Sequence, residues 1–301
     1  MRKHLFIALC ILLLPGLALA QKVGWQKPVL GSLPVRHHQL QQGLVFHLLI
    51  NEGGGFPKDH TDNRNHVTVM ADDVDWSTGK HGPSIINDVS NDYMSLPGTN
   101  FPSVGNTFTF AAWIYPTVVG YRASIWSPSD TNNMFQLEVG TGTGGGNNKI
   151  VVFEPGTWIA QTTSATNIIV VNEWQHIVYT RSGTGAGTHS MYYNGILQVL
   201  DRDDAGNFSD GTATRLIGAR TATTQEFTGK ISEIRIYNKP LTSGEVKWLA
   251  QEPFADYVRT SAARHSAFAA AAAPTEKPVP PKLIIISKQN AKGKDRIKWV
   301  D

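Results

Sequence analysis

Short runs of apolar or alternating residues recur along the chain, and segments rich in Gly, Asn, Asp, Ser and Pro separate them. Each run has the length of a strand and is too short for an ordinary helix. Such runs with turn residues between them predict an all-β sandwich or barrel. The predicted strands cover residues 44–50, 93–96, 107–115, 134–139, 149–153, 158–161, 167–171, 173–181, 190–193, 196–200, 215–217 and 230–237.

The run over residues 107–115 is apolar on both faces of its predicted strand. Phe108 and Phe110 share one face, while Trp113 and Tyr115 share the other. Successive side chains of a strand point to opposite sides of the sheet. We therefore expect a central strand that is covered on both sides.

Two local signals add detail to the predicted sheets. Asn194-Gly195 separates two predicted strands. Both residues tolerate the positive φ angles of a two-residue type I′ hairpin turn. In residues 231–236 the alternation breaks once, which indicates a bulge or a strand covered on both sides.

One helix is expected after the last predicted strand. Thr242 can cap its first turn, and Glu245, three residues later, completes a capping box. Val246, Trp248 and Leu249 form an apolar stripe, and a following proline ends the helix. We expect this short helix to pack against the end of the sandwich.

The first 20 residues have the three parts of a secretory signal peptide. A basic segment at residues 1–4 precedes an apolar run at 5–14, and an Ala-Leu-Ala sequence ends at Ala20. The apolar run is shorter than the roughly 20 residues that cross a bilayer. We therefore expect cleavage near Ala20, a mature chain without a membrane span, and a secreted, extracellular or periplasmic protein. The only cysteine, Cys10, lies in the apolar run, so the mature chain must be stabilised without disulfides.

Composition divides the mature chain into four predicted parts. Residues 21–42 are a polar lead-in, 43–254 hold the strands, 255–281 are an Ala- and Pro-rich linker, and 282–301 are a basic tail. Residues 21–254 carry 16 Lys and Arg against 20 Asp and Glu, a balance of −4, whereas residues 255–301 carry 9 against 4, a balance of +5. A nucleic-acid reader shows a basic face on its folded domain, so the acidic balance argues against a nucleic-acid partner.

Six segments, in this order, resemble laminin-G-like jelly-roll domains of the concanavalin A-like lectin/glucanase superfamily. They are residues 43–55, 62–68, 91–96, 108–116, 173–178 and 229–241. The last, Gly-Lys-Ile-Ser-Glu-Ile-Arg-Ile-Tyr-Asn-Lys-Pro-Leu, is similar to the family's closing G-x-I-D-E-V-R-I-Y-N-R-A-L. The resemblance covers residues 43–254 and implies an antiparallel jelly-roll sandwich of two sheets.

The resemblance also implies a possible structural calcium, but two positions depart from the family pattern. In residues 62–68, read as the family's D-x-S-G-N-x-N-x-G-T turn, Asn63-Arg64 stands in place of Ser-Gly. Ser232 stands where relatives place an acidic calcium ligand. Because Ca²⁺ prefers several oxygen ligands, Glu52, Asp62 and Asp92 are the candidate ligands, with solvated or capping carboxylates as the alternative. No other cofactor is expected.

The motifs of the common hydrolytic mechanisms are absent from the sequence. Retaining glycoside hydrolysis needs two carboxylates about 5 Å apart, and the E-x-D-x-x-E pattern of the superfamily's glucanases does not occur. Glu138 and Glu154 lie on separate predicted strands. A nucleophilic triad needs an activated Ser or Cys, but there is no G-x-S-x-G and no mature cysteine. We expect a protein that is not an enzyme.

Aromatic side chains are the candidates for ligand contact, because exposed aromatic faces can stack on sugar rings. Tyr121, Trp126 and Trp158 lie in or near polar, loop-like segments and are the candidate ligand-binding residues, with packing against a loop as the alternative. Trp113 and Trp174 lie in apolar patterns and are expected in the core.

These observations favour a secreted, non-catalytic binding module for carbohydrate or a surface glycoprotein. The first alternative is a structural or adhesive surface protein that presents the sandwich on its linker and is anchored by its tail. The second is a polysaccharide hydrolase or lyase with scattered catalytic residues.

Overall fold

The computed structural model describes residues 25–71, 74–88, 91–99, 101–102, 104–118, 122–128, 136–141, 148–154, 157–162, 168–208, 212–221 and 224–257. All of them belong to one compact unit, Gly24–Val258, which is longer at both ends than the predicted 43–254. The predicted signal peptide, nearly all of the linker and the basic tail lie outside the described residues. Within the described ranges, no helix has both the length and the apolar character needed to cross a membrane.

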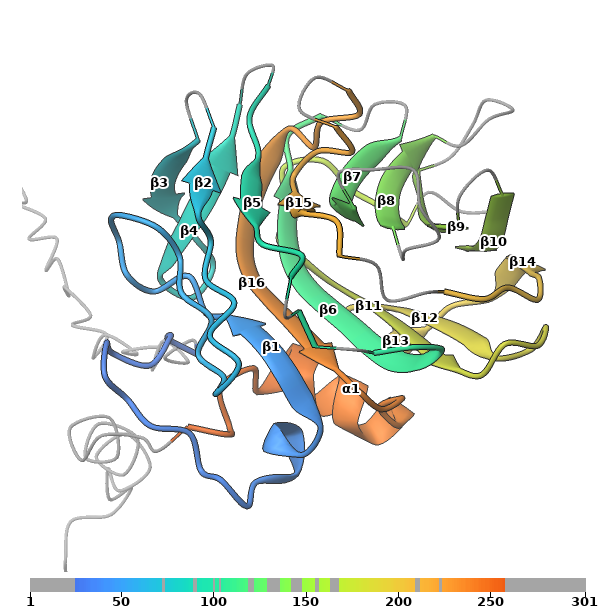
Figure 1. Cartoon of the computed structure of the whole chain (residues 1–301), viewed down its shortest axis with the longest axis horizontal. Coiled ribbons are helices and arrows are strands. Elements are labelled where there is room, and N and C mark those ends of the chain that lie inside the picture. The colour runs from blue at the N-terminus through green and yellow to red at the C-terminus, as the bar shows by residue number, and fades with distance from the viewer. Residues whose placement is uncertain are drawn as a thin grey trace, which may run out of the picture. The chain divides into compact units, whose positions relative to one another are not determined.

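Two antiparallel sheets form the domain (Figure 1). The first sheet has the order β13 (Ile196–Leu197), β12 (His189–Tyr193), β11 (Gln175–Ser182), β6 (Thr107–Pro116), β16 (Gly229–Tyr237), β4 (Pro83–Asn87) and β3 (Asp75–Thr78), and β1 (Leu44–Leu48) also pairs with β16. The second sheet has the order β14 (Leu200–Asp203), β10 (Thr157–Thr162), β9 (Asn148–Glu154), β8 (Gln136–Thr141), β7 (Ala123–Pro128), β15 (Arg215–Ile217), β5 (Met94–Leu96) and β2 (Val69–Met70). The predicted antiparallel jelly-roll sandwich is confirmed.

The main hydrophobic core lies between the two sheets. Phe110, Ile177 and Ile234 of the first sheet pack in one cluster with Ile125 and Val152 of the second. Each such side chain stabilises the fold by roughly 1.5–3 kcal/mol relative to leaving it exposed.

A second core covers the outer face of the first sheet. There the helix α1 (Ser243–Gln251) and the short 3₁₀ helix η1 (Gln39–Gln41) pack on the sheet through Leu40, Val178, Tyr192, Tyr237 and Leu249. This second layer explains why β6 is apolar on both faces, and it confirms that β6 is a central, doubly covered strand.

The local turn, bulge and cap predictions are confirmed. Asn194 and Gly195 have φ angles of 49° and 81°. The register between β16 and β6 shifts between Ile231 and Glu233, which places a bulge there. At α1, the Thr242 backbone N–H donates to Glu245 Oε2 (2.8 Å), and the Glu245 backbone N–H donates to Thr242 Oγ1 (3.3 Å).

Some strand predictions were wrong or incomplete. Residues 168–171 form no strand. The run predicted at 196–200 divides, because β13 ends at Leu197 in the first sheet and β14 begins at Leu200 in the second. The strand β3 was missed because most of its side chains are polar, although its backbone pairs with β4 and Trp76 packs against the main core.

Candidate functional site

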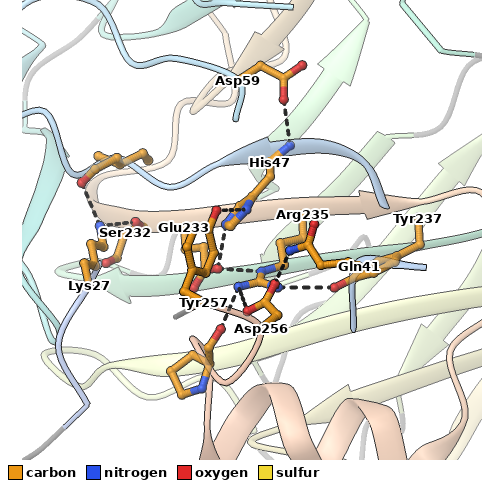
Figure 2. A network of polar contacts seen from close by, with 12 residues as sticks. Lys27, Gln41, His47, Asp59, Ser232, Glu233, Arg235, Tyr237, Asp256 and Tyr257 are labelled. Atoms are coloured by element: carbon orange, nitrogen blue, oxygen red, sulfur yellow. Dashed lines mark hydrogen bonds and ion pairs between the residues drawn. The ribbon is translucent and has the colours of Figure 1, made fainter. Parts of the chain in front are cut away.

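A network of buried ionic and polar side chains lies on the outer face of the first sheet, where β1 and β16 pair (Figure 2). At its centre is the fully buried Arg235. Its Nε donates to Glu233 Oε1 (2.6 Å), Nη1 donates to Asp256 Oδ2 (2.7 Å), and Nη2 donates to Asp256 Oδ1 (3.2 Å) and Pro253 O (2.6 Å). Glu233 and Arg235 stand two residues apart on one strand, so their side chains share a face. The planar guanidinium thus joins β16 to the segment after α1.

For Glu233 and Arg235, the opposite charges in this network outweigh the effect of burial on the pKa. Burial alone would raise the pKa of Glu233, but the Arg235 guanidinium and the hydrogen bond with His47 lower it to about 2. Burial would lower the pKa of Arg235, but Asp256 and Glu233 hold it above its ordinary range. Burial and the Arg235 charge lower the pKa of His47, although Glu233 opposes them. At neutral pH the network therefore contains a carboxylate, a guanidinium and a neutral imidazole.

His47 connects β1 to the same network. Its Nε2 lies 2.9 Å from Glu233 Oε1, and its Nδ1 lies 3.2 Å from the Tyr257 hydroxyl. A neutral imidazole has one donor and one acceptor nitrogen, so Nε2 donates to the carboxylate and the Tyr257 hydroxyl donates to Nδ1. The His47 backbone N–H donates to Asp59 Oδ1 (3.0 Å), which ties the following loop to β1.

The network is arranged for stability. Arg235 and Asp256 are fully buried, and Glu233 is nearly so. A catalytic acid or base must reach the proton that it transfers, and these groups are instead paired with one another inside the protein. Their evident role is to join β1, β16 and the segment 253–257.

An aromatic strip, defined as Trp113, Tyr115 and Trp174, lies on the same outer face of the first sheet. Trp113 and Tyr115 lie two residues apart on β6, so their side chains share one face of the sheet. The rings of Tyr115 and Trp174 lie 5.4 Å apart. Trp113 is buried, whereas Tyr115 and Trp174 are half-buried. Lys80 Nζ lies 4.1 Å from the centre of the Trp113 ring, and Lys230 Nζ lies 5.9 Å from that of Tyr115. Aromatic faces beside polar donors are the usual lining of small-molecule sites.

Buried ring nitrogens lie beside Trp113 at one end of the strip. The rings of His176 and His81 lie 5.0 Å and 5.2 Å from the Trp113 ring. Trp113 Nε1, His176 Nδ1 and His81 Nε2 have no hydrogen-bond partner among the described residues. Burial lowers the pKa of His176 to about 3, so its ring is neutral at neutral pH. These nitrogens retain hydrogen-bonding capacity, which buried polar groups normally use.

The structure corrects the expected position of Trp126. Its ring lies in the main core, 3% exposed, and packs 5.7 Å from the rings of both Phe46 and Phe110. The polar flanking residues misled the prediction because they are buried too: the Ser127 hydroxyl donates to Ala219 O (2.7 Å). Trp126 therefore has no exposed face for a ligand. Tyr121 and the side chain of Trp158, the other predicted contacts, lie outside the described residues.

The three predicted calcium ligands do not form one site. Glu52 follows β1, and its Oε1 lies 3.5 Å from His60 Nε2. Asp62 is exposed, whereas Asp92 is buried and its Oδ2 accepts a hydrogen bond from the Asp88 backbone N–H (2.9 Å). In the described part of the chain, no group of three or more His, Cys, Asp or Glu side chains could hold a metal ion. Calcium binding stays a prediction.

Two features escaped the sequence reasoning, although both left a signal. Asp59 organises the turn after β1, since its carboxylate accepts hydrogen bonds from His47 N, Thr61 N, Thr61 Oγ1 and Asn65 N. Asp-x-Thr is a recognisable turn signal, because an Asp side chain often bonds to the backbone two residues on. The turn after β1 is therefore organised by Asp59, three residues before the segment 62–68 that resembled the family's turn. The alternation along β6 likewise placed Tyr115 beside Trp113, but the partner Trp174 was expected in the core.

Comparison of the sequence with models of known families identifies a matching family. A family model described as the concanavalin A-like lectin/glucanases superfamily, of the Laminin_G_3 type, matches residues 88–247. No curated protein sequence matches significantly.

The fold is shared with a solved domain of an arabinanase and with solved binding domains of toxins. Domain 4 of AbnA, an extracellular GH43 arabinanase from Geobacillus stearothermophilus solved with arabinotriose, has a TM-score of 0.51 at 20% identity, over 69% of this chain and 98% of that one. The binding domain of Paraclostridial Mosquitocidal Protein 1 has 0.51 at 17% identity, over 71% and 53%. The binding domain of botulinum neurotoxin DC in complex with SialylT has 0.50 at 14% identity, over 69% and 50%. This chain thus spans about half the length of the two toxin domains, and at these identities the likeness shows the fold alone.

Proposed function

The chain belongs to the concanavalin A-like lectin/glucanase superfamily, and from this premise we propose that it is a secreted, non-catalytic module that binds carbohydrate or a surface glycoconjugate. The aromatic strip is the proposed contact surface. The observation that carries the proposal is the pair of half-buried rings, Tyr115 and Trp174, 5.4 Å apart on the outer face of the first sheet.

Physical chemistry supports this choice of surface. The apolar faces of a sugar ring stack on aromatic rings, while its hydroxyls need hydrogen-bond partners. Lys230 Nζ lies near the Tyr115 ring, and Lys80 Nζ lies near the Trp113 ring. Both ammonium groups can donate to sugar hydroxyls. The strip therefore combines the two kinds of contact that a saccharide needs.

The similar solved structures support the same ligand class. Domain 4 of the arabinanase was solved with arabinotriose, and the botulinum neurotoxin DC domain was solved with SialylT. The absence of a paired-carboxylate motif from the sequence supports a non-catalytic role. The signal-peptide pattern in residues 1–20 supports export.

A binding experiment with two variants tests the proposal. Arabinotriose and SialylT, together with a glycan array, are the probes for wild-type protein. We expect binding to at least one glycan class, and we expect Y115A and W174A to weaken it by about tenfold each, which corresponds to about 1.4 kcal/mol.

Trp248→Ala is the matched control, because Trp248 is also half-buried but lies on α1 and packs 4.6 Å from His38. W248A should bind like the wild type. Failure of folded wild-type protein to bind any glycan, or equal losses in all three variants, would overturn the proposal.

A further inference from the structure

Lys27 is a buried lysine whose side chain is surrounded by backbone oxygens. It is 8% exposed, and its Nζ donates to Ile50 O (2.8 Å), Pro83 O (2.5 Å) and Ser232 O (2.5 Å). Figure 2 shows the Lys27 ammonium beside Ser232 at the edge of the ionic network. We call the three carbonyls the carbonyl cage. An ammonium has three donors, and each finds one cage oxygen.

Unusual backbone geometry accompanies two of the cage carbonyls. Ile50, which follows β1, has a φ of +52°. A β-branched residue rarely adopts this conformation, so the surrounding structure must hold it there. Ser232 lies at the bulge of β16, where the register with β6 shifts, and a bulge releases a residue from the regular ladder. The carbonyls come from segments far apart in the sequence, yet all three accept from one nitrogen.

Further oxygens without partners are present in and around the cage residues. Asn51 Oδ1, Glu52 Oε2, Ser84 Oγ and Ser232 Oγ are buried and have no hydrogen-bond partner among the described residues. Ser232 is itself a cage residue, and Asn51, Glu52 and Ser84 follow cage residues by one or two positions in the sequence. Carbonyl, carboxylate and hydroxyl oxygens are the ligands of hard cations. The three cage carbonyls, which converge on Lys27 Nζ, therefore have the donor chemistry of a cation site.

Two carboxylates lie near the buried Lys27 ammonium and act against its desolvation. Burial lowers the pKa of Lys27 to about 7, while the carboxylates of Glu233 and Glu52 act in the opposite direction. Lysine is almost never fully buried without partners. The two carboxylates therefore offset part of the desolvation of the positive charge, and the three cage carbonyls supply its hydrogen-bond partners.

We propose that the carbonyl cage is a hard-cation site that the chain fills with its own Lys27 ammonium, and that it binds Ca²⁺ or Na⁺ when this side chain is removed. The tethered cation fastens the segment before β1 to β4 and β16 without any bound metal. This inference concerns how the domain is held together and does not depend on the proposed sugar binding.

The test compares full-length wild-type protein with K27A and K27M. All three are melted in a buffer of choline chloride, with NaCl, KCl, MgCl₂ or CaCl₂ added in separate arms. K27A opens space at the cage, whereas K27M fills most of that space with an uncharged side chain. We expect the Tm of the wild type and of K27M to be insensitive to the added cation. We expect K27A to have a lower Tm, raised again by roughly 5 °C at saturating Ca²⁺ or Na⁺.

Titration calorimetry with CaCl₂ and NaCl then tests the stoichiometry: one site in K27A and none at this position in the wild type. If K27A does not fold in choline buffer, it is refolded with and without Ca²⁺ and Na⁺, and recovery only with a cation supports the proposal. A K27A protein that no cation stabilises or rescues overturns it. So does an equal response of wild type and K27A, since the cation would then bind elsewhere.

Discussion

At the scale of single residues, burial decides which protonation states the fold can hold. Arg235 and Glu233 stay charged in the interior because each faces an opposite charge. His176 has no such partner within hydrogen-bonding distance of Nδ1 among the described residues. It is 3% exposed, and an isolated buried charge is strongly disfavoured. Its ring must therefore remain neutral in the folded state.

This difference predicts an acid-dependent loss of stability. The folded-state pKa of His176 is about 3, below its ordinary value of 6.5, because of burial and the nearby positive charges of Arg235 and Lys80. The unfolded chain therefore binds a proton as the pH falls below 6.5, while the folded protein does not. The free energy of unfolding should decrease by about 1.4 kcal/mol per pH unit from this residue between pH 6.5 and pH 3. Urea unfolding at pH 4, 5, 6 and 7 measures that slope.

In H176F this part of the slope should disappear, although other buried groups keep theirs. His37 is exposed, and H37F is the control that should leave the pH dependence unchanged. Parallel pH profiles for H176F and the wild type would show that His176 is not the responsible group.

At the scale of elements, the capping box decides where α1 begins, and the β12–β13 turn packs closely against this helix. Thr242 and Glu245 exchange backbone and side-chain hydrogen bonds at its first turn. A β-carbon added at Gly195, in the β12–β13 turn, would lie 3.1 Å from Ala250 Cβ of α1. The helix therefore sits closely on a turn that itself requires positive φ.

The capping box predicts a modest and specific effect of substitution. T242A removes the acceptor of the Glu245 backbone N–H and should lower the free energy of unfolding by about 1 kcal/mol. T242S keeps the hydroxyl and should stay close to the wild type. Denaturant unfolding of the three proteins measures the difference, and an equal loss in T242A and T242S would contradict a capping role.

At the scale of the whole domain, the ionic network joins the two ends of the described chain. Val35 N donates to Asp256 O (2.7 Å), and Gln41 Nε2 donates to Asp256 Oδ2 (2.5 Å). Asp256 is in turn held by Arg235 on β16. The segments before β1 and after α1 are thereby fastened to the same central strand.

Removal of the central charge should therefore destabilise the domain as a whole. R235M leaves Glu233 and Asp256 without their guanidinium, and breaking a buried pair in this way costs about 3–5 kcal/mol. The triple variant E233Q/R235M/D256N removes all three charges and should recover part of the loss. Urea unfolding measures both. A loss below 1 kcal/mol in R235M, or no recovery in the triple variant, would contradict the assigned role.

Local patterns in the sequence determined the elements and many of their details. Period-two alternation, Asn194-Gly195 and the Thr242–Glu245 capping box predicted strands, a hairpin and a helix start that the structure confirms. Each of these depends on a few neighbouring residues, so short-range physics is sufficient to specify it. The closing motif that carried the family resemblance also contains Glu233 and Arg235, the centre of the ionic network.

Only the tertiary structure decided what covers each face. Trp126, with serine neighbours, is in the core, whereas Trp174, in an apolar run, is half-buried on the outer face. Alternation assigns a side chain to one side of a strand, but it does not say which distant segment packs there. The same holds for Lys27, whose three carbonyl partners lie 23, 56 and 205 residues away. Burial and convergence are properties of segments remote in sequence, and no local pattern encodes them.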